Sequence, residues 1–195
     1  MALHSITRGF IPLTLAAGLA GFTNPASAVT LLEVNIDTSS LTGTAQLAFD
    51  LTNGDGVANN TVIIMDAGGG IGPPGNWTLS DTDFFNELLL PVTLGASLSF
   101  TLSLTENFAG GPLSDQLALF LLDSTASMPL FATSDPTGNG ALFAVDLGVT
   151  GGLQPYQPTS SPAATWTVTD AAIPEPGVLL LFGSGLLGLV CRRWR

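Results

Sequence analysis

The stretch from Ser97 to Thr105 alternates hydroxyl and apolar side chains without a break, and this pattern limits the fold more than any other feature. Successive side chains of a β-strand point to opposite faces, so an alternation of period two predicts a strand with one buried face. Similar but shorter runs recur along the chain, separated by breakers rich in Gly and Pro. The predicted strands cover residues 31–37, 45–51, 61–65, 97–105, 117–122, 128–133, 141–147 and 164–169.

Many short strands with turn residues between them predict an all-β fold. We therefore expect a single β-sandwich domain over residues 29–170, with a jelly roll as one arrangement within that class. One segment, residues 81–90, fits a short helix that Ser80 or Asp81 would cap and Pro91 would stop. Residues 154–162 are rich in Pro and Ser and predict a long loop.

The charged residues are distributed unevenly. All basic residues lie near the two ends of the sequence, and so do the only histidine and the only cysteine: Arg8, Arg192, Arg193, Arg195, His4 and Cys191. Residues 29–175 hold all fifteen Asp and Glu residues and no basic residue, which gives this stretch a formal charge of −15.

This distribution excludes several classes of site. Without interior His, Cys or Lys, the domain cannot build a Ser-His-Asp or Cys-His centre or the usual Cys/His zinc site. Nucleic acid is excluded as a partner because a polyanion would meet only negative charge. Two chemistries remain, namely paired carboxylates and calcium binding by oxygen ligands.

The first 28 residues read as a secretory signal peptide. Arg8 precedes an apolar run over residues 10–22, and Ala26 and Ala28 supply the small residues that signal peptidase accepts. The apolar run is shorter than the roughly 20 residues that a membrane-spanning helix needs. We expect cleavage after Ala28.

The last 25 residues, 171–195, have three parts in a fixed order. Pro174, Glu175 and Pro176 come first, and the two prolines favour an extended backbone there. An uncharged run over residues 177–191 follows, and as a helix it would be about 22 Å long against a hydrocarbon core of about 30 Å. The chain ends in a basic tip formed by Arg192, Arg193, Trp194 and Arg195, which the positive-inside rule places on the cytoplasmic side of the membrane.

This arrangement resembles the PEP-CTERM sorting domain of Gram-negative bacteria. The resemblance implies that an exosortase, a membrane enzyme, recognises the motif at residues 174–176 and removes the tail near it. It also implies a cytoplasmic-membrane intermediate held by the C-terminal transmembrane helix, followed by delivery to the cell surface or extracellular matrix. Such systems are associated with exopolysaccharide production, so the resemblance implies a matrix role with exopolysaccharide as a candidate partner. A plain C-terminal membrane anchor is the alternative.

One loop has part of the pattern of a calcium site. Asp50, Asn53 and Asp55 surround a Gly-rich turn, with Asn59 and Asn60 close behind, but the closing Glu of an EF-hand is missing. Asn, Asp and Gly are also the usual residues of polar turns, and we favour that interpretation. Asp81 and Asp83 are a second, weaker candidate. We therefore expect no cofactor, with calcium as the one alternative.

Three functions fit these features. The first is a non-enzymatic exported protein of the envelope or matrix. The second is an adhesion module that binds carbohydrate or calcium, in which Trp77, Trp166, Tyr156 and several Phe form a platform for sugar rings, although core packing is the commoner fate of such residues. The third is a glycoside hydrolase that uses two carboxylates.

Overall fold

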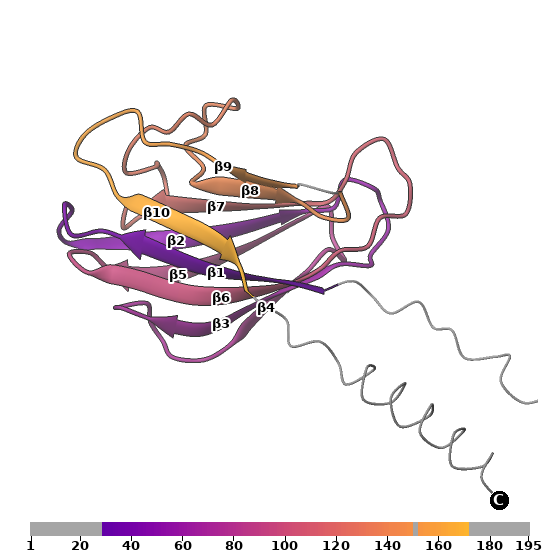
Figure 1. The fold of residues 1–195 in the computed structure, drawn as a ribbon, viewed down its shortest axis with the longest axis horizontal. Helices are drawn as coiled ribbons and strands as arrows, with labels where there is room; N and C mark the ends of the chain where they lie inside the picture. Colours follow the sequence, from indigo (N-terminus) through magenta and orange to yellow (C-terminus); the bar gives the residue numbers. More distant parts are fainter. Residues whose placement is uncertain (1–28, 150–151, 172–195) are drawn as a thin grey trace, which may run out of the picture.

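The computed structural model describes residues 29–149 and 152–171, and in this part of the chain it contains ten β-strands and no helix (Figure 1). The strands are β1 (Val29–Asp37), β2 (Thr44–Thr52), β3 (Thr61–Gly68), β4 (Trp77–Ser80), β5 (Phe85–Thr93), β6 (Ser97–Thr105), β7 (Gln116–Leu122), β8 (Phe143–Asp146), β9 (Leu153–Pro155) and β10 (Thr165–Asp170). They form two antiparallel sheets that face each other, so the predicted all-β sandwich is confirmed.

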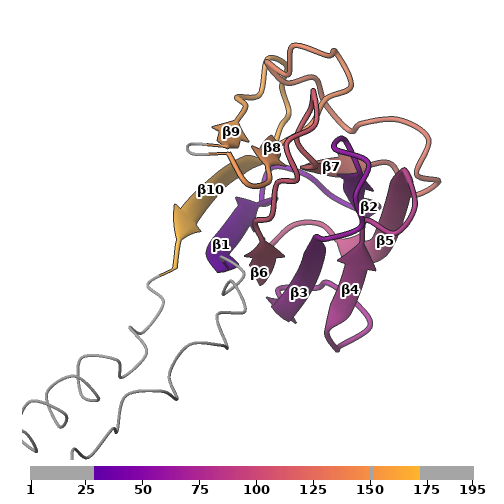
Figure 2. The same ribbon diagram turned by 90° about the vertical axis from the view of Figure 1, so that its right-hand side faces the viewer.

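Each sheet has five strands. The first sheet has the order β10-β1-β6-β3-β4 and the second has the order β5-β2-β7-β8-β9. The chain crosses from the first to the second of the two layers seen in Figure 2 between β1 and β2, between β4 and β5, and between β6 and β7. Because β1 is antiparallel to β6 and β2 is antiparallel to β7, the β1–β2 and β6–β7 crossings lie at opposite ends of the sandwich. Most strand pairs therefore join segments that are far apart in the sequence.

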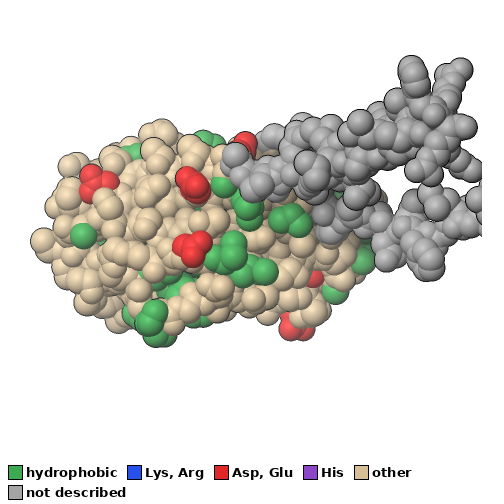
Figure 3. Space-filling model, turned by 60° about the horizontal axis from the view of Figure 1, so that its bottom comes forward, with side chains coloured by type: hydrophobic (Ala, Val, Ile, Leu, Met, Phe, Trp, Pro, Cys, Tyr) green, Lys and Arg blue, Asp and Glu red, His purple; other side chains and the backbone are tan. Residues whose placement is uncertain are grey.

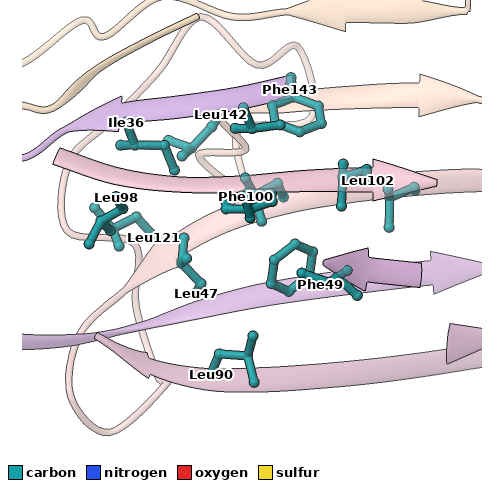
Figure 4. Close-up of a cluster of buried hydrophobic side chains, with 14 of the residues drawn as sticks. Ile36, Leu47, Phe49, Leu90, Leu98, Phe100, Leu102, Leu121, Leu142 and Phe143 are labelled. Atoms are coloured by element: carbon teal, nitrogen blue, oxygen red, sulfur yellow. The ribbon is translucent and has the colours of Figure 1, made fainter. Parts of the chain in front are cut away.

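The hydrophobic core lies between the two sheets (Figure 4). Strand β6 occupies the predicted residues, and its four apolar side chains are buried while its Ser and Thr side chains face outward. Phe100 of β6 meets Phe49 of β2 edge to face, with ring centroids 5.4 Å apart and an interplanar angle of 73°. Each fully buried Leu or Phe contributes roughly 2 kcal/mol, so this layer of large side chains is the main force holding the sheets together.

The predicted helix over residues 81–90 is wrong. Strand β5 occupies Phe85–Thr93 and pairs along its whole length with β2. Its inward positions Leu88, Leu90 and Val92 alternate, which suits a strand, and Pro91 is tolerated because β5 is an edge strand of the second sheet. The position of a proline at an edge therefore explains why a helix stop signal was misleading.

Two other segments also differ from the prediction. Residues 128–133 contain no strand and make only isolated bridges, one from Pro129 to Leu122 and one from Thr133 to Pro158. The predicted loop over residues 154–162 begins inside β9, whose short pairing with β8 ends at Pro155. The backbone hydrogen bonds of both segments go mostly to loops and strand ends, as in the bond from the Thr159 N–H to the Ala132 carbonyl, so neither segment forms a continuous ladder.

The two ends of the domain lie close together. β1 begins at Val29 opposite Thr105, and β10 ends at Asp170 opposite Leu32 (Figure 1). The backbone N–H of Ala171 donates a 2.8 Å hydrogen bond to the carbonyl oxygen of Leu31. The predicted signal peptide with Ala26 and Ala28, and the motif, apolar run and basic tip of the C-terminal segment, lie outside the described residues. Within residues 29–149 and 152–171, no helix has the length and apolar character needed to cross a membrane.

Candidate functional site

The structure separates the predicted calcium ligands. Asp50 lies within β2, on the outer face of the second sheet, because its neighbours Phe49 and Leu51 point into the core. Asn53 and Asp55 lie in the loop after β2. Among the described residues no group of three or more His, Cys, Asp or Glu is arranged to hold a metal ion.

Asn53 and Asp55 use their side chains to shape their own loop. The Asn53 Oδ1 accepts a 2.7 Å hydrogen bond from the Gly56 N–H, and its Nδ2 donates one of 2.8 Å to the Asp81 carbonyl. The two carboxylate oxygens of Asp55 accept 2.8 Å hydrogen bonds from the backbone N–H groups of Val57 and Ala109. These hydrogen bonds tie the turn to itself and to the neighbouring loops.

Two buried carboxylates extend this arrangement across the end of the sandwich. Asp115 accepts hydrogen bonds from the Gly54 and Asp55 N–H groups at 2.8 and 3.2 Å and from the Asn60 Nδ2 at 2.6 Å. Asp81 accepts hydrogen bonds from the Asn59 and Asn60 N–H groups at 3.0 and 2.8 Å. We call this set, Asn53, Asp55, Asn60, Asp81 and Asp115, the end network. Burial, together with the nearby Asp115 carboxylate, raises the pKa of Asp81 above its ordinary value despite these hydrogen bonds.

A hollow of about 350 Å³ lies on the outer face of the second sheet, and Asp50 is one of the residues that line it. Its floor is low because two alanines, Ala118 of β7 and Ala144 of β8, sit opposite each other in register. Asp50 is opposite Ala118 on the other side, across the β2–β7 pair. Three neighbouring strands therefore place a carboxyl group beside a shallow, small-residue floor.

The loop over residues 135–141 forms one wall of the hollow. The Asp135 carboxylate holds this loop by accepting hydrogen bonds from the N–H and hydroxyl of Thr137 at 2.8 to 2.9 Å and from the Ala141 N–H at 3.2 Å. Burial works against ionisation of Asp135, but these hydrogen bonds outweigh it and hold the pKa of Asp135 below its ordinary value. Asp135 therefore remains charged while it fixes the wall.

Amide and phenol groups also line the hollow. The Nε2 atoms of Gln116 and Gln154 each donate a 2.7 Å hydrogen bond to one oxygen of Asp146. The Tyr156 hydroxyl lies 3.4 Å from the Oε1 of Gln154 as a hydrogen-bond donor. Burial, with the charges of Asp135 and Asp146, raises the pKa of Tyr156, so its hydroxyl keeps its proton.

Asp50 differs from the other carboxylates of the hollow. Its Oδ1 is shielded from solvent and has no hydrogen-bond partner. Burial raises the pKa of Asp50 to about 6, and the negative charge of Glu87, its cross-strand neighbour, adds to this effect. Asp50 is therefore the carboxyl group of the hollow that would gain most from a new hydrogen-bond donor.

Three aromatic rings also line the hollow, those of Phe85, Phe120 and Tyr156. Phe85 is 48% exposed even though it lies on a strand. The predicted platform contained Tyr156 but also Trp77 and Trp166, and the structure places those two on β4 and β10, the opposite edges of the first sheet. Both are partly buried against the core, and Trp166 stacks on Phe131 at a centroid distance of 6.1 Å.

Sequence reasoning missed most of this hollow because its residues come from distant segments. Asp135 stands in a turn pattern, and Phe85 stood in the segment that was predicted to be helical. Asp115 of the end network was also missed. An available signal for Asp115 was its place directly before the apolar run 117–122, where a polar side chain has to satisfy the backbone of a neighbouring loop.

Comparison with protein-family models finds a match to the PEP-CTERM protein-sorting motif at residues 172–195. The chain carries a PEP-CTERM sorting motif. The matched segment begins directly after Ala171, where the described part of the domain ends. No curated protein and no solved structure matches the chain in the corresponding comparisons.

The PEP-CTERM motif marks the protein for sorting by an exosortase and for export across the membrane to the cell surface. The predicted resemblance to a PEP-CTERM sorting domain is thus confirmed over residues 172–195.

Proposed function

We propose that this PEP-CTERM protein is a non-enzymatic component of the cell envelope or extracellular matrix, with the β-sandwich as its working part. The observation that supports this best is the position of the sorting motif. Strand β10 completes the first sheet at Asp170, and the motif segment starts at residue 172. Processing within that segment would leave every strand of the sandwich intact.

The use of the carboxylates supports a structural role. Asp55, Asp115, Asp135 and Asp146 each accept hydrogen bonds on both carboxylate oxygens from groups of the domain itself. A general base or a nucleophile needs an oxygen that can reach the substrate. Residues 29–175 also contain no His, Cys, Lys or Arg that could take that role.

The sorting step is tested by the intact mass of the protein from a host that contains an exosortase. We expect the wild type to end near Pro174–Pro176, and Glu175→Ala to keep its tail in the membrane fraction. Glu106→Ala is the matched control, because it changes the same residue type in the loop after β6, and it should be processed like the wild type. If all three proteins keep Arg195, the tail acts as a plain anchor and the proposal fails.

A carboxylate-based glycoside hydrolase is the second candidate, and one observation favours it. Asp50 and Glu87 are directly opposite each other in the β2–β5 register, and burial raises the pKa of Asp50 to about 6. Such enzymes use two neighbouring carboxyl groups, and the one that acts as the general acid has a raised pKa. This candidate requires release of reducing sugar ends that is lost in both Asp50→Asn and Glu87→Gln. Without such release the candidate is dismissed.

The calcium-binding alternative makes a separate prediction. Calcium bound only by the folded state would raise the melting temperature of the protein. The hydrogen bonds that Asp55 and Asn53 already make to backbone groups argue against it, and we expect no rise in melting temperature on adding calcium.

A further inference from the structure

We infer that the hollow on the outer face of the second sheet binds an uncharged saccharide, with Phe85, Phe120 and Tyr156 contacting its sugar rings and Asp50 accepting a hydrogen bond from one of its hydroxyl groups. This inference rests on the proposed matrix role in one respect: that role determines the location in which the protein would meet the saccharide. The binding itself is a property of the domain.

The shape of the hollow suits a short stretch of a glycan chain. Its volume of about 350 Å³ lies at the lower end of the range of small-molecule sites. The alanine floor lets a flat ring approach the sheet, and the loop over residues 135–141 stands beside it as a wall. The hydrogen bonds of Asp135 fix that wall in advance, so little conformational entropy would be lost when a ligand binds.

The aromatic rings supply the apolar part of the recognition. Phe85, Phe120 and Tyr156 come from β5, β7 and the segment after β9, and they surround the same floor. The C–H faces of a pyranose ring pack well against aromatic faces, which are apolar and carry a negative quadrupole. The exposure of Phe85 leaves its ring accessible to a ligand in the hollow.

The charges of the hollow decide which saccharides fit. Asp50 and Asp135 line it, and the domain has no basic residue, so an acidic saccharide would meet like charge without compensation. On the face drawn in Figure 3, outside the grey atoms, acidic side chains are likewise scattered among polar and apolar ones with no basic side chain among them. A neutral sugar brings hydroxyl donors, and these can reach the second Asp50 oxygen, Oδ2, which is not shielded as Oδ1 is and accepts no hydrogen bond from the described residues.

The test is saturation-transfer difference NMR on the full-length protein in a polyoxyethylene detergent, which carries no sugar headgroup. The probes are the methyl glycosides of glucose, galactose, mannose and N-acetylglucosamine, with methyl glucuronide as the acidic comparison. We expect at least one neutral probe to give signals from its ring C–H protons, and the glucuronide to give none. Failure of all four neutral probes overturns the inference.

Two variants place the binding in the hollow. Phe85→Ala should weaken binding about tenfold or more, since contact with one aromatic ring is worth about 1.4 kcal/mol. Phe84→Ala is the matched control, because Phe84 is the preceding residue, is 76% exposed and does not line the hollow, and it should bind like the wild type. Ala118→Leu should fill the floor and abolish the signals while the thermal transition is retained.

The outcomes separate this inference from the proposed function. Equal binding by the wild type, Phe85→Ala and Ala118→Leu would place the sugar elsewhere and overturn the inference, as would equal binding of the glucuronide. Sorting is read by intact mass in the host and sugar binding is read on the purified protein. Either result can therefore fail while the other stands.

Discussion

The end network and the hollow contain the same kind of side chain in opposite situations. In the end network the Asp115 carboxylate has three donors, two backbone N–H groups and one amide, and every one belongs to the domain. In the hollow Asp50 has a shielded oxygen with no partner. The first arrangement stabilises the fold, whereas the second lowers its stability. An aspartate is thus assigned to structure or to binding by what its oxygens already accept.

The comparison predicts that removing the Asp115 carboxylate lowers the free energy of unfolding, whereas removing the Asp50 carboxylate raises it. We expect Asp115→Ala to lower the free energy of unfolding by about 3 kcal/mol, because it leaves the partly buried N–H groups of Gly54 and Asp55 and the buried amide of Asn60 without this acceptor. Urea denaturation of the purified protein measures this. Asp83→Ala, which changes an exposed aspartate of the neighbouring turn, should cause little change. A loss no larger than that of the control would remove the end network as a stabilising element.

A carboxylate that lines the hollow should nevertheless stabilise the fold, as Asp115 does, if its oxygens accept hydrogen bonds from the domain. Thr137→Val removes the hydroxyl that donates to both oxygens of Asp135, and we expect a loss of about 1.5 kcal/mol. Thr167→Val on the exposed outer face of β10 is the control, since it makes the same change in shape. The same denaturation experiment applies. Equal effects of the two substitutions would show that Asp135 does not depend on Thr137.

Asp50→Asn should stabilise the protein at pH 7 by about 1 kcal/mol, a value discounted for the contact of this carboxyl group with solvent. The folded state raises the pKa of Asp50 from 3.8 to about 6, so folded protein binds the proton more tightly than unfolded protein. The stability contributed by this group is therefore complete below pH 3.8 and is lost as the pH rises through about 6.

The free energy of unfolding of the wild type and of Asp50→Asn, measured as a function of pH, tests whether Asp50 loses its stabilising contribution as the pH rises. Asp37, Asp123 and Asp135 have lowered pKa values, and their contributions are lost only as the pH falls below the ordinary value. The window from pH 4 to 7 therefore reports the raised groups, Asp50 and Asp81. The stability of the wild type should fall across this window more steeply than that of Asp50→Asn. Parallel profiles would contradict the assignment of the raised pKa to Asp50.

The smallest expected effect is that of Glu87→Gln, which removes the secondary cause of the Asp50 shift. Burial, the main cause, remains, so the pKa of Asp50 should move only part of the way toward its ordinary value and stability at pH 7 should rise by about 0.3 kcal/mol. Titration of the Asp50 side-chain carbon by NMR measures the pKa directly. A complete return to the ordinary value would show that charge, and not burial, causes the shift.

The sequence predicted those parts of the molecule that follow from local pattern. β6 was predicted to the residue because its alternation is unbroken, and the β-sandwich class followed from the recurrence of such runs. β5 was not, because Pro91 signals a helix stop locally and is acceptable only at a sheet edge, which is a property of the assembled sheet.

The sites show the same limit more strongly. Asp50 was selected from the sequence for its nearness to a Gly-rich turn, yet its surroundings are set by β5 and β7 through register. The meeting of Phe85, Asp135 and Tyr156 depends on the order of strands in the second sheet, which no single stretch of sequence encodes. The sorting motif is the opposite case, since its information is linear and could be read without a fold.

The pairing of β1 with β10 also sets a sequence of events for the nascent chain. Ile36 and Trp166 are cross-strand partners although about 130 residues separate them. During synthesis from the N-terminus, β1 can therefore pair with β10 only after nearly the whole domain has been made. In the sequence, the matched motif segment begins at residue 172, two residues after the end of β10. An exosortase that recognises the motif would then act on a segment that follows directly after β10, the last strand to pair in the sandwich.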